Sequence, residues 1–251
     1  MSSIEIDEPY IDRQRHELHR RTLTVVDRIE LTPHMLRFTL TSEDLGNFVS
    51  ASPDDHVKLF FQTKGGDREM RDYTPRAFDT EKRQLVLDFA VHEAGPATDW
   101  AQKAQVGDTL NIGGPRGSQV IRNVRNWLLI GDETALPAIG RRIEEMEKGD
   151  SVHAIIAIPD AADQQTFETQ AAQTIDYIVR PVDQAADAEP LLKALKAVSL
   201  AADCFVWIAA ESLVTRTLRT YLLENGWPKN RIKAAGYWTK GVADAAEKFV
   251  D

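Results

Sequence analysis

Apolar and polar positions alternate in short segments along the first half of the chain. Residues 35–40 are the clearest case and follow a turn at Thr32-Pro33. Similar segments lie at 23–26, 56–61, 71–78 and 84–91. A period of two is the pattern of strands with one buried face, and the Gly and Pro residues between the segments are typical of turns. Short strands at this spacing predict a small antiparallel six-stranded β-barrel.

The pattern changes after residue 125. Strand-like segments at 127–131, 152–158, 175–179, 205–209 and 231–236 alternate with helical stretches at 133–147, 191–198 and 211–224. Strands that alternate with helices are typical of βαβ units around a mostly parallel sheet. We therefore predict a charged N-terminal arm over 1–20, a barrel domain over 21–122, and an α/β domain with a C-terminal tail over 123–251.

Composition places this chain among ordinary globular proteins. It has 251 residues, of which 43% are hydrophobic and 27% charged, as in a typical soluble domain. No apolar run approaches the ~20 residues needed to cross a bilayer. The N-terminal arm is charged and lacks the apolar core of a signal peptide. These features predict a cytoplasmic protein.

The cysteine, charge and histidine content excludes several classes of site. The single cysteine, Cys204, rules out an intramolecular disulfide, a Cys-ligated Fe–S cluster and a Cys-rich zinc site. Its apolar neighbours predict a buried thiol. A net charge of −9 disfavours general nucleic-acid binding. The one short histidine spacing, His16-x-x-His19, is interpreted as an exposed helix face in the arm, so no metal site is predicted.

The segment Arg71-Asp72-Tyr73-Thr74-Pro75-Arg76 carries two guanidinium groups, a phenol ring and a hydroxyl on one short extended stretch. Alternation places Tyr73 on the opposite face from its immediate neighbours, with Arg71 and Arg76 at its edges. An aromatic ring for stacking and arginine forks for phosphate suit a large, flat, anionic ligand. The alternative is a half-exposed strand followed by a Thr-Pro turn.

A second candidate site follows at residues 91–100. A predicted strand ends at His92, a possible extra donor, Gly95 lets the backbone turn, and Pro96 suits the first position of a helix. The free N–H groups of that helix start, with the Thr98 hydroxyl, would form an anion site for a pyrophosphate. Trp100 lies one turn further on and could cover an aromatic ring. The alternative is a plain strand–turn–helix with a core tryptophan. Together the two segments predict FAD as the ligand.

A third candidate site is the strand end at Gly131, which Asp132, Glu133 and Thr134 follow. It lacks the Gly-x-Gly-x-x-Gly fingerprint, but the carboxyl ends of strands are where open α/β sheets bind ligands. The two acids are interpreted either as nucleotide contacts or as caps of the following helix. In both cases the backbone of Gly131 and Thr134 is expected to face a nucleotide.

Three further motifs complete an ordered set: Gly114-Pro115-Arg116-Gly117-Ser118, the continuation Ala135-Leu136-Pro137-Ala138, and Ala235-Gly236-Tyr237-Trp238 with Gly241. With the segments above and Asp88-Phe89-Ala90-Val91-His92, this set resembles the siderophore-interacting proteins, flavin-dependent ferric-siderophore reductases of the ferredoxin-reductase superfamily. The resemblance covers roughly residues 20–242. It implies an FAD-binding barrel followed by an NAD(P)H-binding α/β domain.

The resemblance also implies which residues hold the cofactors and the substrate. Further FAD contacts would be Asp88, Phe89, Val91 and Ala97. The nicotinamide contacts would be Gly131, Asp132, Glu133, Thr134, Ala210, Glu211 and Trp238. Cations near the flavin edge would attract an anionic iron chelate; by family position these are Lys58 and Lys240, and Arg116 is a third candidate. Trp238 is interpreted either as a cover over the cofactors or as a core residue.

Three details bear on the nicotinamide cofactor and the substrate. Asp160, just after the segment 152–158, is placed to hold a ribose 2′-hydroxyl, which favours NADH over NADPH. The family's usual Ala-Gly-Glu reads Ala209-Ala210-Glu211 here, and the extra methyl group could crowd a nicotinamide. The basic pair expected after Trp238 reads Thr239-Lys240, which leaves one cation where the family often has two.

The implied reaction passes electrons from NADH or NADPH through FAD to Fe(III) in a siderophore. Reduced iron holds anionic oxygen ligands less tightly, so Fe(II) is released for use in the cell. The alternatives are a general NAD(P)H-dependent flavin or ferredoxin-type reductase, and a non-enzymatic ferric-siderophore binding protein. Ferredoxin is a further possible electron donor. We expect a monomer without nucleic-acid or membrane partners, and the sequence leaves open whether the siderophore is a catecholate or a hydroxamate.

Overall fold

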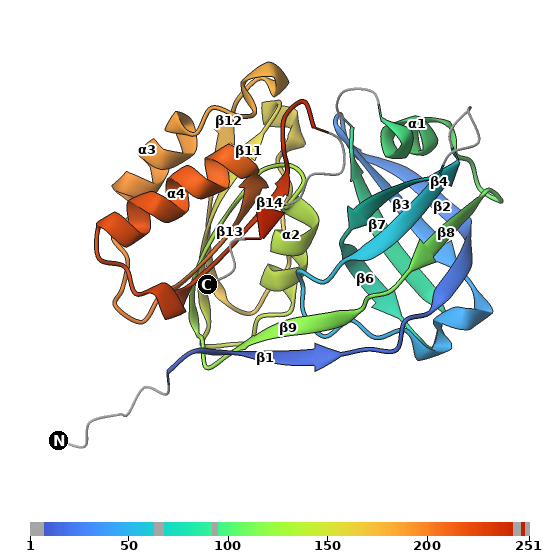
Figure 1. Cartoon of the computed structure of the whole chain (residues 1–251), viewed down its shortest axis with the longest axis horizontal. Helices are drawn as coiled ribbons and strands as arrows, with labels where there is room; N and C mark the ends of the chain where they lie inside the picture. Colours follow the sequence, from blue (N-terminus) through green and yellow to red (C-terminus); the bar gives the residue numbers. More distant parts are fainter. Residues whose placement is uncertain (1–7, 63–67, 92–94, 243–246, 249–251) are drawn as a thin grey trace.

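A computed structural model describes residues 8–62, 68–91, 95–242 and 247–248 of the chain. Two sheets lie side by side, one curled and antiparallel, the other mostly parallel and flanked by helices (Figure 1). The predicted fold class, an antiparallel barrel followed by an α/β domain, is confirmed. Among the described residues, no helix has both the length and the apolar character that crossing a membrane requires.

The antiparallel sheet closes on itself because one stretch of chain contributes to both of its edges. Its strands are β2 (Arg20–Thr32), β3 (Met35–Thr41), β4 (Val57–Gln62), β5 (Arg68–Tyr73), β6 (Pro75–Asp79), β7 (Gln84–Ala90) and β8 (Thr109–Gly113), in the order β5-β4-β8-β2-β3-β7-β6. Thr74 alone separates β5 from β6. Because β5 pairs with β4 and β6 pairs with β7, the seven strands amount to the six passes of chain that the sequence predicts.

Apolar side chains at alternate positions fill the barrel. Leu87 and Phe89 on β7 are fully buried, and Phe38 on β3 meets Phe89 edge to face at 5.2 Å between ring centroids. Burial of one such side chain stabilises the fold by about 2 kcal/mol. Helix α1 (Pro96–Lys103) follows β7 and packs Ala101 into the same core. The residues between the buried positions lie on the outer face of the barrel.

The parallel sheet has helices on both faces. Its strands are β10 (Asn126–Gly131), β11 (Ser151–Ile158), β12 (Ala172–Val179), β13 (Phe205–Glu211), β14 (Ile232–Trp238) and β15 (Glu247–Lys248), in the order β12-β11-β10-β13-β14-β15. All neighbours pair in parallel except β14 and β15. Helix α2 (Leu136–Glu144) lies between this sheet and the barrel, whereas α3 (Glu189–Ala197) and α4 (Ser212–Glu224) cover the outer face (Figure 1).

The strand order identifies where this sheet is open to a ligand. The chain moves from β10 to β11 and β12 on one side, and then returns to β13 on the other side of β10. This reversal is a topological switch point, where open α/β sheets bind ligands, so a crevice is expected at the carboxyl ends of β10 and β13. Asp132 directly follows β10, and β13 ends at Glu211.

The N-terminal arm is partly a strand, contrary to the interpretation of His16 and His19 as an exposed helix face. Strand β1 (Tyr10–Arg15) pairs antiparallel with β9 (Gly117–Arg122), along the lower side of the molecule in Figure 1. His16 follows β1 without helical structure, and its Nε2 lies 2.7 Å from the Ser118 hydroxyl. The arm is thus held by main-chain pairing with a strand that local periodicity does not reveal.

Candidate functional site

An aromatic platform lies where β5 ends. The register pairs Val57 with Tyr73 and Leu59 with Arg71, so Tyr73 and Arg71 share the inner face of the sheet. The half-buried ring of Tyr73 lies on Phe89, with 4.4 Å between centroids and 38° between the ring planes. Burial raises the pKa of the Tyr73 hydroxyl although Arg71 opposes the shift. The phenol therefore stays neutral at physiological pH, as a stacking ring with a hydrogen-bonding group.

Arg71 lies beside this ring with its guanidinium within reach of solvent. One terminal nitrogen donates to the Met70 carbonyl at 2.7 Å, and the other pairs with the partly exposed Glu69 carboxylate at 2.7 Å. An exposed ion pair of this kind contributes about 0 to 1 kcal/mol. A phosphate could therefore replace Glu69 at little cost.

The start of α1 leaves room for a ligand. Gly95 precedes the helix with φ −164°, which is extended backbone open to any residue, so the expectation that glycine is needed for a turn is wrong. A Cβ added at Gly95 would meet nothing within 4 Å, and within the described parts of the chain no side chain caps the helix. Pro96 occupies the first turn as predicted. Uncapped N–H groups facing open space suit a phosphate.

The other predicted residues of this segment differ in where they lie. Trp100 is half-buried and packs against the barrel core, 5.0 Å from Phe38 and 5.4 Å from Phe89 between centroids, which supports the alternative of a packing role. Ala97 and Thr98 are buried at the helix start. His92 lies outside the described residues. Val91, which precedes it, donates its N–H to the His34 carbonyl at 2.9 Å.

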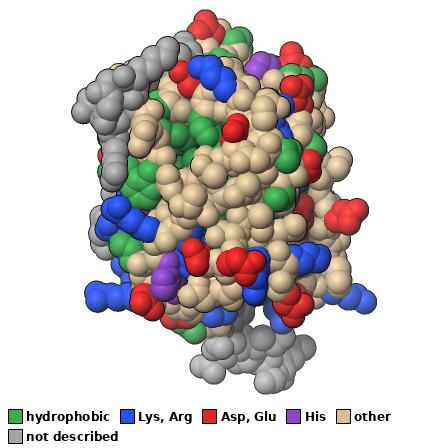
Figure 2. Space-filling model, turned by 90° about the vertical axis from the view of Figure 1, so that its right-hand side faces the viewer, with side chains coloured by type: hydrophobic (Ala, Val, Ile, Leu, Met, Phe, Trp, Pro, Cys, Tyr) green, Lys and Arg blue, Asp and Glu red, His purple; other side chains and the backbone are tan. Residues whose placement is uncertain are grey.

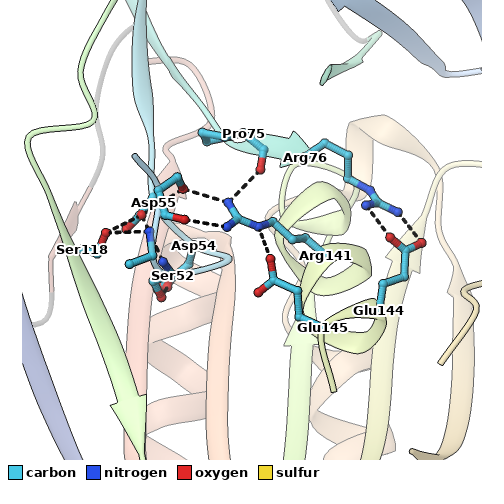
Figure 3. Close-up of polar contacts among 11 residues, drawn as sticks. Ser52, Asp54, Asp55, Pro75, Arg76, Ser118, Arg141, Glu144 and Glu145 are labelled. Carbon is cyan, nitrogen blue, oxygen red and sulfur yellow. Dashed lines mark hydrogen bonds and ion pairs between the residues drawn. The ribbon is translucent and has the colours of Figure 1, made fainter. Parts of the chain in front are cut away.

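Arg76 and Asp88 lie on the outer face of the barrel and pair with other residues of the protein, which corrects their predicted side-chain role in binding a cofactor. Both terminal nitrogens of Arg76 donate to the Glu144 carboxylate, at 2.7 and 2.6 Å (Figure 3). Asp88 accepts two hydrogen bonds from Arg37, at 2.6 and 2.7 Å, and lies 3.7 Å from the Arg76 Nε. The reason is alternation, since Leu87 and Phe89 point inward and Asp88 between them points to the outer face, toward Arg37 and Arg76.

Asp132 is the central polar residue of the crevice in the parallel sheet. One carboxylate oxygen accepts from the Thr134 N–H at 2.9 Å and from its hydroxyl at 2.6 Å. The other accepts from the Glu211 N–H at 2.9 Å and from the Trp238 Nε1 at 2.9 Å. The carboxylate is buried and receives four donors. The alternative that it caps local backbone is therefore supported, and it also anchors Trp238.

The other acids near this crevice also have partners within the protein. Glu133 pairs with Arg180 at 2.9 Å, and both side chains are buried. Burial and the adjacent Asp132 raise the pKa of Glu133 to about 7, although Arg180 opposes this. Glu211 caps α4 by accepting from two of its N–H groups, at 2.6 and 3.2 Å, and also accepts from the Lys240 N–H at 3.2 Å.

Local packing and capping explain three other residues of the predicted nicotinamide site, namely Gly131, Ala210 and Asp160. A Cβ at Gly131 would lie 2.8 Å from the Ala135 Cβ and 2.8 Å from the Ala209 carbonyl oxygen, so glycine is required for packing of strand against helix. The Ala210 methyl group is buried in the core under α3 and α4. The expectation that it could crowd a nicotinamide is therefore not supported. Asp160 accepts from the Ala162 N–H at 2.8 Å and caps a short helical turn.

The three predicted substrate cations lie on separate elements. Lys58 projects from β4 on the face opposite Tyr73 and pairs with Asp72 at 2.8 Å. Arg116 is exposed between β8 and β9. Lys240 follows β14 and donates to the Asp183 carbonyl. Within the described parts of the chain, no group of three or more His, Cys, Asp or Glu side chains could hold a metal ion.

Sequence reasoning missed the polar residues that join the two domains. Arg141 on α2 donates to Ser50 and Pro75 of the barrel, and Asp163 accepts from the Thr32 hydroxyl and from the N–H and Nδ1 of His34. These partners are separated by 66 to 131 positions in the sequence. The one local signal was a pair of arginines directly after the apolar first turns of the helix, at 141 and 142.

A half-buried phenol ring, a neighbouring arginine fork and an uncapped helix start fit FAD, and the crevice at the switch point fits a nicotinamide nucleotide. Fold and site together define a two-domain reductase of the ferredoxin-reductase type. The model of the family described as "Siderophore-interacting protein" matches residues 124–241, and that of the "Siderophore-interacting FAD-binding domain" matches 24–69 and 67–119. The chain belongs to the siderophore-interacting protein family.

Named relatives agree with this assignment. The NADPH-dependent ferric-chelate reductase of Escherichia coli K12 is 32% identical, over 91% of this chain and 96% of that protein. The ferric vibriobactin reductase ViuB of Vibrio cholerae is 28% identical, over 91% and 93%. The crystal structure of a siderophore utilization protein from T. fusca superposes with a TM-score of 0.88 at 33% identity, covering 95% of this chain and 98% of that one.

Proposed function

We propose that this protein is a flavin-dependent ferric-siderophore reductase that takes electrons from NAD(P)H and delivers them to Fe(III) held by a siderophore. The Tyr73 platform carries this proposal, because a half-exposed ring with a phosphate-competent arginine beside it is suited to a dinucleotide with a flat ring system. The relatives named as ferric reductases support the choice of acceptor. The proposed FAD domain spans 21–122 and the proposed nicotinamide domain 123–251.

Each part of the site has a distinct role in this proposal. Tyr73 stacks on the flavin ring, Arg71 exchanges Glu69 for a phosphate oxygen, and the α1 start binds the pyrophosphate. FAD, when bound, accepts a hydride and gives up electrons singly. Asp132 fixes Trp238 at the edge of the crevice, where its indole borders the nicotinamide site. The protein thus supplies orientation, stacking and charge.

The iron chelate is the substrate, and reduction is what releases the metal. Fe(III) is a hard cation that prefers the anionic oxygens of catecholates and hydroxamates, and Fe(II) binds them less tightly. Lys58, Arg116 and Lys240 are the proposed attraction for the anionic complex. Reduction therefore replaces ligand hydrolysis, and the siderophore leaves intact.

The identity of the electron donor is part of the proposal. The E. coli relative is named as NADPH-dependent, whereas the exposed Asp160 favours NADH if its carboxylate leaves its capping position. A ferredoxin donor would need a broad basic face. On the face seen in Figure 2, Lys and Arg side chains are dispersed among acidic ones, which favours a nicotinamide. A monomer is proposed because one chain supplies both domains of the site. Cytoplasmic location remains a prediction from the sequence.

A visible absorption spectrum under anaerobic conditions tests the proposed function. The purified protein with FAD should show flavin bands that bleach on addition of NADH or NADPH. Addition of a ferric siderophore should restore the bands while a ferrous chelator develops colour. Separate titrations with the two nicotinamides identify the donor. Flavin bands that neither nicotinamide bleaches would refute the donor, and failure to take up FAD would favour a binding protein.

A further inference from the structure

Helix α2 is hydrogen-bonded to the barrel at the start of β6. Arg141 donates through one terminal nitrogen to the Pro75 carbonyl at 3.0 Å and to the Ser50 hydroxyl at 2.8 Å, and through the other to the Ser50 carbonyl at 2.9 Å. One turn further along, Glu144 accepts both terminal nitrogens of Arg76. The two arginines point in opposite directions across this contact, one from each domain (Figure 3). Two consecutive residues of β6 are thereby attached to one helix.

The two arginines of this contact are buried, and the fit is close. Arg76 and Arg141 are each 5% exposed, whereas the Glu144 side chain is 35% exposed. A bidentate pair with a buried guanidinium fixes geometry more strictly than a single-point surface pair. Gly140 directly precedes Arg141 on α2. A Cβ there would come within 2.6 Å of the Phe167 ring and 3.3 Å of the Arg76 Nη2. The helix therefore approaches β6 this closely because position 140 has no side chain.

The contact connects the two halves of the proposed site. The chain enters α2 directly from the crevice residues at 131–134, and it enters β6 directly from Tyr73 and Thr74. We infer that Arg76, Arg141 and Glu144 are positioning residues that set the distance between the nicotinamide and the flavin ring. This inference rests on the proposed function, since it concerns the step in which the nicotinamide gives its hydride to the flavin.

A defined distance is required for that step alone. Hydride transfer needs donor and acceptor atoms about 3 to 3.5 Å apart, and a misplacement of about 1 Å can cost 10²-fold in rate. Electron transfer from the flavin to an iron chelate does not involve the nicotinamide, so it does not depend on the distance between the nicotinamide and the flavin. Other contacts, such as Asp163 with His34 and Asp54 with Lys233, hold the domains together elsewhere. Loss of the Arg76–Glu144 pair should therefore let β6 move relative to α2 without separating the domains.

Two conservative variants test the inference by separating the half-reactions. Arg76→Lys keeps the charge but lacks the fork, and Glu144→Gln keeps the shape but lacks the charge. Each should slow bleaching of the flavin by NAD(P)H about tenfold. Reoxidation by ferric siderophore, started from protein reduced chemically with dithionite, should stay within about twofold of wild type, because the iron step does not use α2. The double variant should be no slower than the worse single one.

Arg216→Lys is the matched control. Arg216 also pairs with a glutamate, but through a single nitrogen on the exposed side of α4: its Nη2 lies 2.7 and 2.8 Å from the two carboxylate oxygens of Glu247. It should leave both half-reactions at the wild-type rate. Equal slowing of both half-reactions in the interface variants would overturn the inference, because it would indicate general damage to the flavin site. Bleaching at the wild-type rate in both variants would overturn it as well.

Amide hydrogen exchange on flavin-free protein provides a readout that does not depend on turnover. Both interface variants should exchange faster at Ala77 and Phe78 on β6, while the β10 core strand keeps its protection. Unchanged protection on β6 would show that the contact between α2 and β6 does not hold that strand, and would overturn the inference. If wild-type protein is not bleached by either nicotinamide, the donor in the proposed function fails, and the role in hydride transfer fails with it. Faster exchange on β6 in the variants would then still show that the contact between α2 and β6 holds this strand.

Discussion

The indole Nε1 of Trp238 donates a 2.9 Å hydrogen bond to the carboxylate of Asp132. The two residues lie 106 positions apart, one after the first strand of the parallel sheet and the other at the end of β14. The same carboxylate oxygen accepts the Glu211 N–H, so three strand ends meet at one acid. The C-terminal aromatic residue is thus fixed against the crevice by an acid that the sequence places at a strand end.

Asp132→Asn is expected to destabilise the protein more than its similar shape suggests. Asp132 accepts four hydrogen bonds, and asparagine would turn a donating amide toward two of these donors. A buried mismatch of this kind costs about 1 to 3 kcal/mol per unsatisfied group. We expect the unfolding free energy in urea to fall by about 3 kcal/mol. Trp238→Phe, which removes one donor, should cost less, and equal losses in the two variants would contradict the central role of Asp132.

Local periodicity was sufficient to predict most of the fold. On β7, Leu85, Leu87 and Phe89 alternate with outward residues, whereas β10 is a short strand that is apolar from Trp127 onward, so the two sheet types differ within windows of a few residues. Arm strand β1 was not predicted because none of its residues is buried and it carries no such pattern. Its pairing with β9 spans more than a hundred positions, which no local signal reports.

The candidate site was predictable only in part, for the same reason. The platform of Tyr73 and Arg71 and the start of α1 depend on contiguous residues, and their types alone suggest the chemistry. Arg76 lies in the same motif, but its direction depends on Glu144, which is 68 positions away. Likewise, Asp163 acquires its role from the β2–β3 turn, 129 positions distant at His34. Residue type predicted charge, and tertiary pairing determined what each charge binds.

Arg71→Ala should weaken retention of FAD without unfolding the protein. The guanidinium lies beside Tyr73 and is held by the exposed Glu69, so the folded state loses little when it is removed. A charge-assisted bond to phosphate contributes about 1.5 to 3 kcal/mol, so Kd for FAD should rise about ten- to a hundredfold. Fluorescence titration of flavin into apoprotein measures this, with Arg216→Ala as the surface control. An unchanged Kd would remove Arg71 from the phosphate site.

Lys58 and its partner Asp72 allow a test in which KM for the chelate should change in opposite directions, because Asp72 partly neutralises the charge of Lys58. Lys58→Ala should raise KM for a ferric siderophore about threefold, and Asp72→Asn should lower it, since half-exposed charges contribute at most about 1 kcal/mol. Flavin content should be unchanged in both variants. Lys82→Ala, which removes a lysine from an exposed pair with Asp79, is the control. If both variants shift KM in the same direction, Lys58 does not attract the chelate.

Glu133 should make the stability of the protein fall as pH rises through the weakly acidic range. Burial and Asp132 raise its pKa from an ordinary value of 4.5 to about 7 in the folded protein. Between these values the folded state holds a proton that the unfolded state has lost, so the unfolding free energy decreases with increasing pH. The decrease should be on the order of 3 kcal/mol between pH 4.5 and pH 7, and it should be complete above that range.

Glu133→Gln isolates this contribution, because glutamine keeps the shape and an oxygen that can accept from Arg180 but does not titrate. Urea unfolding of both proteins at intervals from pH 4.5 to pH 8 gives the difference in unfolding free energy. Relative to wild type, the variant should gain stability steadily as the pH increases to about 7 and then reach a plateau. Asp54, whose pKa Lys233 and Arg142 lower despite its burial, titrates below this window in both proteins. A difference that stays constant with pH would show that Glu133 is already ionised throughout, as a simple ion pair with Arg180.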